Sequence, residues 1–233
     1  MARGTQLLSL IAQLRAETGR TQNVAVGVDE VENLKVILQR TQETLYDEYE
    51  WPHLRVQRTI SLVAGSRYYN FPSDLNFDRI QDVKLKYNGV YTDLERGILF
   101  DDYSIYDSNA ATPDRSFPVL KWDIRHTGST EQMEVWPIPS DAATLYLFGT
   151  KKLGNLIQES DTAALDDRLI VLFAAAEILS RQKSPDAKNK LSQAERRLLM
   201  LRRNGQGASK TVQVGLGRGR NTPNTGKTVI VVK

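Results

Sequence analysis

The sequence predicts an α+β fold: a four-helix core, made of two N-terminal and two C-terminal helices, with an inserted antiparallel β domain and an extended C-terminal tail. Three observations lead to this prediction. Apolar residues recur three and four positions apart near both ends of the 233-residue chain, as on the buried face of a helix. Between these regions, apolar and polar residues alternate, as they do in half-buried strands. The last segment is rich in glycine and has no apolar face to bury.

Two helices are expected in residues 1–52, the N-terminal helical pair. The first runs from about Thr5 to Thr18 and presents Leu7, Ile11 and Leu14 on one face. The second begins at a capping box formed by Asp29 and Glu32. It ends near Trp51-Pro52, because a proline disfavours a helical residue before it. Its buried face is predicted to consist of Val31, Leu34, Leu38, Thr41 and Leu45.

Residues 53–152 are expected to form the antiparallel β domain. Asn88-Gly89, the strongest short hairpin signal, joins two alternating runs that end and begin at Tyr87 and Val90. Residues 100–117 are polar and lack a clear period, which predicts a long loop with room for one helical turn. The alternating runs are Val56–Leu62, Val83–Tyr87, Leu120–Ile124, Glu131–Trp136 and Thr144–Phe148.

Residues 160–204 are expected to form the C-terminal helical pair and to pack with residues 1–52. The first helix follows Asp166-Asp167, where the helix dipole favours negative charge. Ser184 then caps the second helix, with Pro185 at its first position and Asn204-Gly205 at its end. The apolar stripe of the first helix is Leu165, Leu169, Leu172, Ala176 and Leu179, and that of the second is Leu191, Ala194, Leu198 and Leu201.

Charge divides the chain into an acidic body and a basic end. From Arg196 to Lys233 there are nine basic residues and no acidic one. Residues 1–195 hold the other 22 basic residues and all 28 acidic ones, a net charge of −6. Residues 205–233 form the extended tail, with six of the fifteen glycines and only short β-prone patches. Such a tail orders against a partner, and basic tails bind nucleic acid or acidic protein surfaces.

No catalytic, metal or cofactor site is predicted. Cysteine is absent, which excludes disulfides, thiolate metal sites and cysteine nucleophiles. His53 and His126 lie far apart in sequence and lack matched partners. The acidic doublets Asp101-Asp102 and Asp166-Asp167 are interpreted as solvated surface, because adjacent side chains mostly point apart. Gly226-Lys227-Thr228 lacks the earlier glycine and the following helix of a phosphate-binding loop. No apolar run is long enough to span a membrane.

The order of these elements resembles a known family. Trp51 ends a helical pair, and the segment 65–74 has the pattern G-x-x-Y-Y-x-F-P-x-D. A strand containing Trp136-Pro137-Ile138-Pro139 and the apolar run Leu145–Phe148 follow, then an acidic-capped helix pair and a basic tail. Over nearly its whole length the chain resembles the head-to-tail adaptor, or tail tubular, proteins of short-tailed bacteriophages.

The resemblance implies a structural virion protein rather than an enzyme. Such adaptors form a ring, commonly of twelve subunits, below the capsid portal protein at the head–tail junction, after assembly in the host cytoplasm. Helices of neighbouring subunits form the ring wall, and the β domain offers surfaces to the tail nozzle protein and to a tail fibre or tailspike protein. The tail extends along the portal, and genomic DNA passes through the lumen.

Assembly residues follow from this resemblance. The valines of the tail are expected to pair with the portal by strand addition, while its basic residues steer the tail by charge. Four arginines near the end of the last helix are expected at a subunit interface or in the channel, with a solvated helix face as the alternative. The tail candidates are Lys210, Val212, Val214, Arg218, Arg220, Lys227, Val229 and Val231, and the helix candidates are Arg196, Arg197, Arg202 and Arg203.

Two other functions remain open from the sequence. The first is a nucleic-acid-binding protein whose basic tail contacts phosphates, with binding that weakens steeply as salt rises. The second is a hydrolase on the β domain, for which His126 and Asp101 would be the residues to test.

Overall fold

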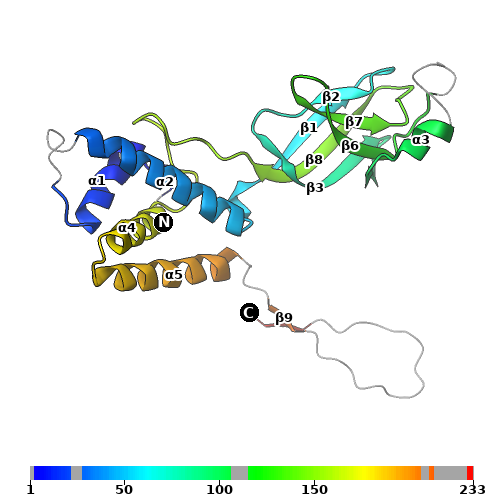
Figure 1. The fold of residues 1–233 in the computed structure, drawn as a ribbon. Coiled ribbons are helices and arrows are strands. Elements are labelled where there is room, and N and C mark those ends of the chain that lie inside the picture. Colours follow the sequence, from blue (N-terminus) through cyan, green and yellow to red (C-terminus); the bar gives the residue numbers. More distant parts are fainter. Residues whose placement is uncertain (1–2, 22–27, 106–114, 206–209, 213–229, 233) are drawn as a thin grey trace. The chain divides into compact units, whose positions relative to one another are not determined.

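The computed structural model describes residues 3–21, 28–105, 115–205, 210–212 and 230–232 (Figure 1). The chain divides into two compact units. The helical unit comprises Met1–Leu45 and Asn155–Lys233, and the β unit comprises Tyr46–Gly154. Helices and strands are both abundant in the described residues, which confirms the predicted α+β class.

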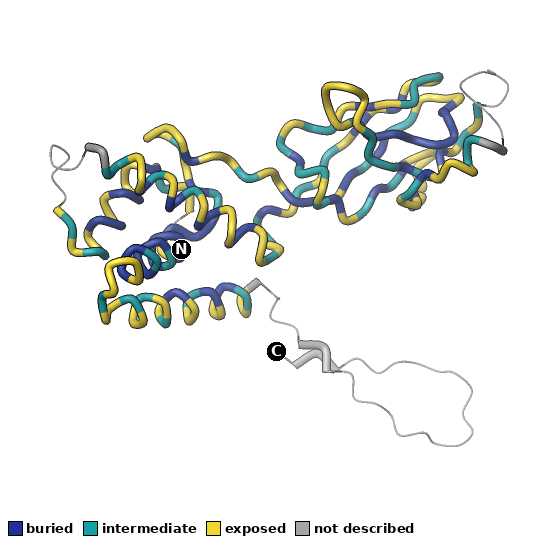
Figure 2. The backbone as a smooth tube through the Cα atoms, viewed as in Figure 1, coloured by how far each residue is buried: buried dark blue, intermediate teal, exposed yellow. Residues whose placement is uncertain are grey.

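The described residues of the helical unit form four helices whose positions match the predicted ones closely. α4 is buried along most of its length and contacts α1 and α5 (Figure 2). α2 is tied to the segment that precedes α4. The side-chain oxygens of Gln39 and Gln42 accept hydrogen bonds from Leu156 N–H at 2.6 Å and from Ala164 N–H at 3.0 Å. The helices are α1 (Leu7–Glu17), α2 (Val28–Glu48), α4 (Asp167–Arg181) and α5 (Asp186–Gly205).

The helix ends test the predicted caps. Ser184 does precede α5, and its Oγ accepts a hydrogen bond from Asp186 N–H at 3.4 Å, but the helix begins at Asp186, so Pro185 is not its first residue as predicted. α2 begins at Val28, one residue before Asp29. The predicted capping box is therefore wrong, because a cap residue has non-helical backbone and Asp29 is already helical.

Among its described residues, the β unit forms two four-stranded sheets, with strand orders β1-β8-β3-β4 and β2-β7-β6-β5. Asn88 and Gly89 have φ angles of 49° and 80°, the left-handed conformation that a tight hairpin turn requires, and they join β3 to β4 as predicted. The strands are β1 (Arg55–Leu62), β2 (Tyr68–Asn70), β3 (Leu75–Tyr87), β4 (Val90–Asp93), β5 (Glu95–Arg96), β6 (Lys121–His126), β7 (Glu131–Trp136) and β8 (Ala143–Lys151), with a 3₁₀ turn, η1 (Pro52–Leu54), before β1.

One strand pair departs from the antiparallel prediction. β5 runs parallel to β6, with Glu95 opposite Lys121 and Arg96 opposite Trp122. A parallel pair needs a long crossover connection, whereas an antiparallel pair needs only a turn. The polar segment predicted as a long loop supplies that crossover, and it contains the short helix α3 (Phe100–Ile105).

Both sheets contribute to one hydrophobic core. Alternate side chains of the strands point inward, so each sheet has one apolar face. Trp122 and Tyr69 are among these buried residues. The core consists of Ile60, Leu62, Tyr69, Leu75, Ile80, Val83, Leu85, Leu94, Val119, Trp122, Met133, Val135, Leu145 and Leu147.

Candidate assembly surfaces

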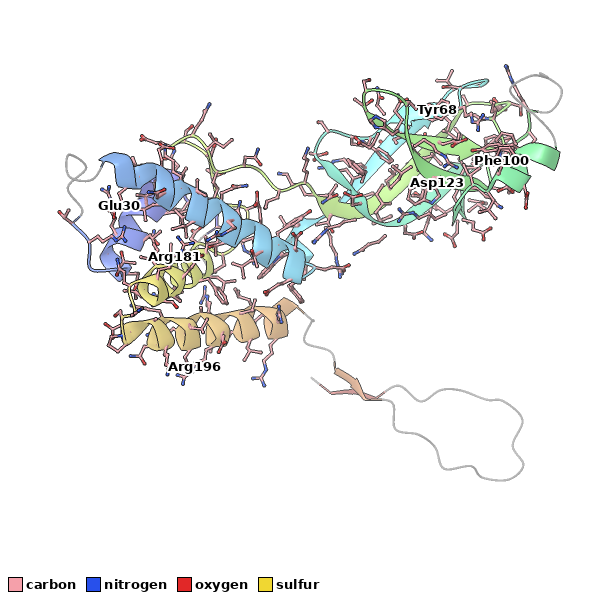
Figure 3. All side chains as sticks on the ribbon, viewed as in Figure 1. Glu30, Tyr68, Phe100, Asp123, Arg181 and Arg196 are labelled. Atoms are coloured by element: carbon pink, nitrogen blue, oxygen red, sulfur yellow. The ribbon has the colours of Figure 1, made fainter. Side chains whose placement is uncertain are left out.

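The four arginines of α5 do not share one environment. Arg196 and Arg203 are exposed, and Figure 3 shows Arg196 on the side of α5 remote from α4. Arg202 is half-buried, while Arg197 turns toward the start of α4, where its Nη2 lies 2.7 Å from Asp166 Oδ2. The 3.6-residue helical period explains this division, because positions 196 and 203 lie on one face and position 197 on another.

The start of α4 is a buried acidic site. Asp166 caps the helix by accepting a hydrogen bond from Leu169 N–H at 3.0 Å, and its hydrogen bond to Arg197 raises the pKa of that guanidinium. Asp167 is also buried and accepts a hydrogen bond from Thr5 Oγ1 at 2.5 Å. The interpretation of this doublet as solvated surface is therefore wrong, because Thr5, just before α1, and Arg197 on α5 supply partners that close over it.

Two short strands are described in the tail, and they pair with each other. β9 (Lys210–Val212) runs antiparallel to β10 (Ile230–Val232), which contains Val231. A two-stranded ribbon leaves one unpaired edge on each strand, so this pairing is compatible with strand addition to a partner. The remaining tail candidates lie outside the described residues: Val214, Arg218, Arg220, Lys227 and Val229.

An open hollow of about 710 Å³ lies beside α3 in the β unit. Phe100 and Leu99 are 82% and 65% exposed at its edge, and Tyr68 is 40% exposed. Arg67, Arg125 and Glu134 also line the hollow. Exposed apolar side chains gathered around polar groups are typical of a protein contact surface.

Glu134 on β7 joins the elements around this hollow. Its side chain is 1% exposed. Oε1 accepts hydrogen bonds from Tyr103 Oη at 2.6 Å and from Arg67 Nε at 2.7 Å, while Oε2 accepts one from Arg125 Nε at 2.7 Å. Arg67 directly precedes β2, Arg125 lies on β6 and Tyr103 on α3. One buried carboxylate therefore ties α3 to three adjacent segments of a sheet.

The same carboxylate sets the protonation of its neighbours. The hydrogen bond to Glu134 raises the pKa of Arg125. Burial, together with the hydrogen bond to Glu134, raises the pKa of Tyr103. Both groups therefore keep their protons at neutral pH. The network fixes the shape of the hollow.

A comparison with protein-family models identifies the family. Residues 5–219 match the model described as SU10 adaptor protein. The chain belongs to the SU10 adaptor protein family. The match confirms the predicted resemblance to phage head-to-tail adaptors, and the family description indicates a structural protein of the virion. No curated protein matches this adaptor.

The two local motifs behind the resemblance meet in the adaptor's β unit. Gly65 N–H donates a hydrogen bond to Pro139 O at 2.8 Å, which joins the Tyr-x-Phe-Pro turn to the Pro-x-Pro segment. Gly65 has a φ of 80°, and a Cβ there would lie 2.7 Å from Arg115 Nη1. The Arg115 side chain could move aside, but the positive φ strains any residue with a Cβ, so glycine is favoured at this junction.

His126 and Asp101, the residues to test for a hydrolase, are both exposed and lie on different elements of the adaptor. His126 is exposed, with Nδ1 3.5 Å from Glu131 Oε1, and Asp101 is exposed on α3. Within the described ranges, no group of three or more His, Asp or Glu residues could hold a metal ion. Among the helices described there, none is long and apolar enough to cross a membrane.

The Glu134 network is not visible in the sequence. Glu131–Trp136 was predicted correctly as a strand, but alternation assigns a glutamate in such a strand to the solvent face. β7 is a central strand and α3 covers this position, so Met133, Glu134 and Val135 are all buried. Only the presence of Arg67 just before β2 and of Arg125 on β6 could have indicated a partner for the charge, and the register of these strands against β7 is not visible in the sequence.

Proposed function

We propose that this SU10 adaptor is a head-to-tail adaptor that forms a ring, of twelve subunits, below the portal protein. In this position it joins the capsid to the tail nozzle and to fibres or tailspikes, and it encloses the channel through which genomic DNA passes. It acts at the head–tail junction of the virion after assembly in the host cytoplasm. The family match across residues 5–219 carries this proposal.

Each segment of the chain has a proposed part in the ring. Residues 1–52 and 160–204 pack as a four-helix core that forms the ring wall. Residues 53–152 form the domain that contacts nozzle, fibre or tailspike, and the exposed Leu99 and Phe100 beside the hollow support such a contact. Residues 205–233 bind the portal.

The tail joins the portal through main-chain pairing and charge. Its β-prone segments supply hydrogen-bonding edges, and strand addition draws most of its affinity from the main chain. The absence of acidic residues from Arg196 to Lys233 gives the tail a uniform sign, which favours an acidic portal surface.

The test combines the adaptor with its cognate portal and compares the full-length chain with one ending at Asn204. Mass photometry gives the mass of each complex, and cryo-electron microscopy gives its symmetry. A ring on the portal that forms only with the full-length chain would support the proposal. A full-length chain that never binds the portal would overturn it.

A second function rests on the nine basic residues at the C-terminal end. A nucleic-acid-binding protein would bind free duplex DNA with an affinity that falls steeply between about 50 and 200 mM salt. Removing residues 205–233 would abolish that binding. Salt-sensitive DNA binding together with no portal binding would favour this alternative.

A further inference from the structure

The side of α5 remote from α4 carries exposed apolar and basic side chains. Leu199 and Met200 are 59% and 62% exposed. Arg196 and Arg203 lie beside them at helical spacing and are exposed as well. The described salt bridges of α5, Lys190–Glu17 and Arg197–Asp166, use residues of its other side. This outer face of α5, formed by Arg196, Leu199, Met200 and Arg203, thus keeps its positive charge.

The outer face of α2 has the opposite charge pattern. Glu32, Val36 and Glu43 lie four and seven positions apart and share one side of the helix. Val36 is 62% exposed, and the Glu32 side chain is 74% exposed. Two cations flank this side: Arg40 pairs with Glu177 on α4, and Lys35 pairs with Glu32 one turn along α2, with Nζ 2.8 Å from Oε1. The outer face of α2, formed by Glu32, Val36 and Glu43, therefore presents an apolar residue between two acidic ones.

The two faces lie on different sides of the helical unit. Figure 1 shows α4 between α2 and α5. The Arg40–Glu177 and Arg197–Asp166 pairs hold α2 and α5 to α4. Each outer face points away from α4, so the two cannot meet within one chain. They can meet between two copies.

We propose that the outer face of α5 in one copy packs on the outer face of α2 in the next copy. This contact joins two different surfaces, and such head-to-tail contacts generate rings when the rotation closes. Basic residues around an apolar pair meet acidic residues around an apolar residue, so charge and apolar area are both matched. The inference rests on the proposed ring and names its subunit contact.

The apolar residues decide between a second copy and DNA as the occupant. Arg196 and Arg203 alone would suit phosphates, which bind cations irrespective of sequence. Leu199 and Met200 gain nothing from phosphates, but they lose exposed apolar area when a protein covers them. The combination of methionine and arginine with apolar area is typical of the centre of a protein interface.

The test uses two full-length charge-reversal variants, each mixed with the cognate portal. Variant A carries Arg196→Glu and Arg203→Glu, and variant B carries Glu32→Arg and Glu43→Arg. Each alone places like charges opposite each other at every contact, so we expect the concentration for half assembly to rise on the order of tenfold or more. An equal mixture of A and B restores opposite charges at every contact of an alternating ring.

Mass photometry of the portal complexes then separates the outcomes. Loss of the ring with each variant alone, and its recovery in the mixture, would support the contact. A ring that persists with A or B alone, or a mixture that fails to recover while both variants retain wild-type thermal unfolding, would overturn it. Wild-type protein that forms no ring would overturn the proposed function itself.

Two controls complete the design. Lys86→Glu with Lys152→Glu makes the same charge change on exposed positions of the β unit and should leave assembly unchanged. Binding of duplex DNA to the wild-type chain, lost in variant A without any effect on the ring, would assign the outer face of α5 to DNA and refute the subunit contact.

Discussion

Replacing Glu134 by glutamine should destabilise the β unit strongly. The substitution keeps the size of the side chain but removes the charge that Arg67 and Arg125 share. It also turns an amide N–H₂ toward groups that are themselves donors. Breaking a buried ion pair from one side costs about 3–5 kcal/mol. Arg125 is 40% exposed, so water screens part of its share, and about 2–4 kcal/mol remains.

Tryptophan fluorescence during urea unfolding measures this loss of stability in the β unit specifically. The three tryptophans, Trp51, Trp122 and Trp136, all lie in the β unit. With a urea dependence of about 2 kcal/mol per molar, the midpoint should fall by roughly 1–2 M. A midpoint unchanged within about 0.3 M would refute the assignment of a net stabilising role to the buried carboxylate.

Two matched variants separate charge from hydrogen bonding. Glu131→Gln changes an exposed glutamate on the same strand and should shift stability by less than about 0.5 kcal/mol. Tyr103→Phe removes one donor to Glu134 and keeps both cations, so it should cost about 1–2 kcal/mol. If Tyr103→Phe costs as much as Glu134→Gln, the hydrogen bond and not the charge dominates.

Three further predictions concern packing, capping and pH. Gly149→Ala should cost the β unit about 1–3 kcal/mol, read by tryptophan fluorescence, because a Cβ would lie 2.9 Å from Arg79 O. Asp166→Ala should lower the free energy of unfolding of the helical unit by about 2 kcal/mol, because it removes the cap of α4 and leaves the Arg197 guanidinium without its carboxylate. Ellipticity at 222 nm during urea unfolding measures this change. The hydrogen bond from Lys121 lowers the pKa of Asp102 in the folded state. Their pairing therefore stabilises the fold fully above the ordinary aspartate pKa of about 3.9, and this stabilisation is lost as the pH falls through the lowered pKa of the folded state.

Each of these has its own control. A Cβ at Gly154 meets nothing within 4 Å, so Gly154→Ala should be neutral, and equal losses at both glycines would contradict the packing argument. Glu195→Ala replaces an exposed carboxylate of α5 and should leave the urea midpoint followed by ellipticity unchanged. Asp102→Asn should flatten part of the decline in the urea midpoint below about pH 4, and an identical decline in this variant would contradict the assigned group.

Local patterns in the sequence determine much of the secondary structure. The helices, the hairpin at Asn88-Gly89 and the cap of α5 are all set by residues within a few positions of one another. Steric limits on the backbone and the periods of helix and strand act at this range. The resemblance to head-to-tail adaptors depends on the order of elements, which local patterns also determine.

Only the tertiary structure decided which charged residues are buried and what they pair with. Alternation predicts a solvated Glu134, and adjacency predicts a solvated Asp166-Asp167 pair, yet all three are buried. Arg67 and Glu134 are 67 positions apart, and Asp166 and Arg197 are 31 apart. A charge buried without a partner is costly, and strand register and helix packing, which depend on the whole fold, bring the partners together.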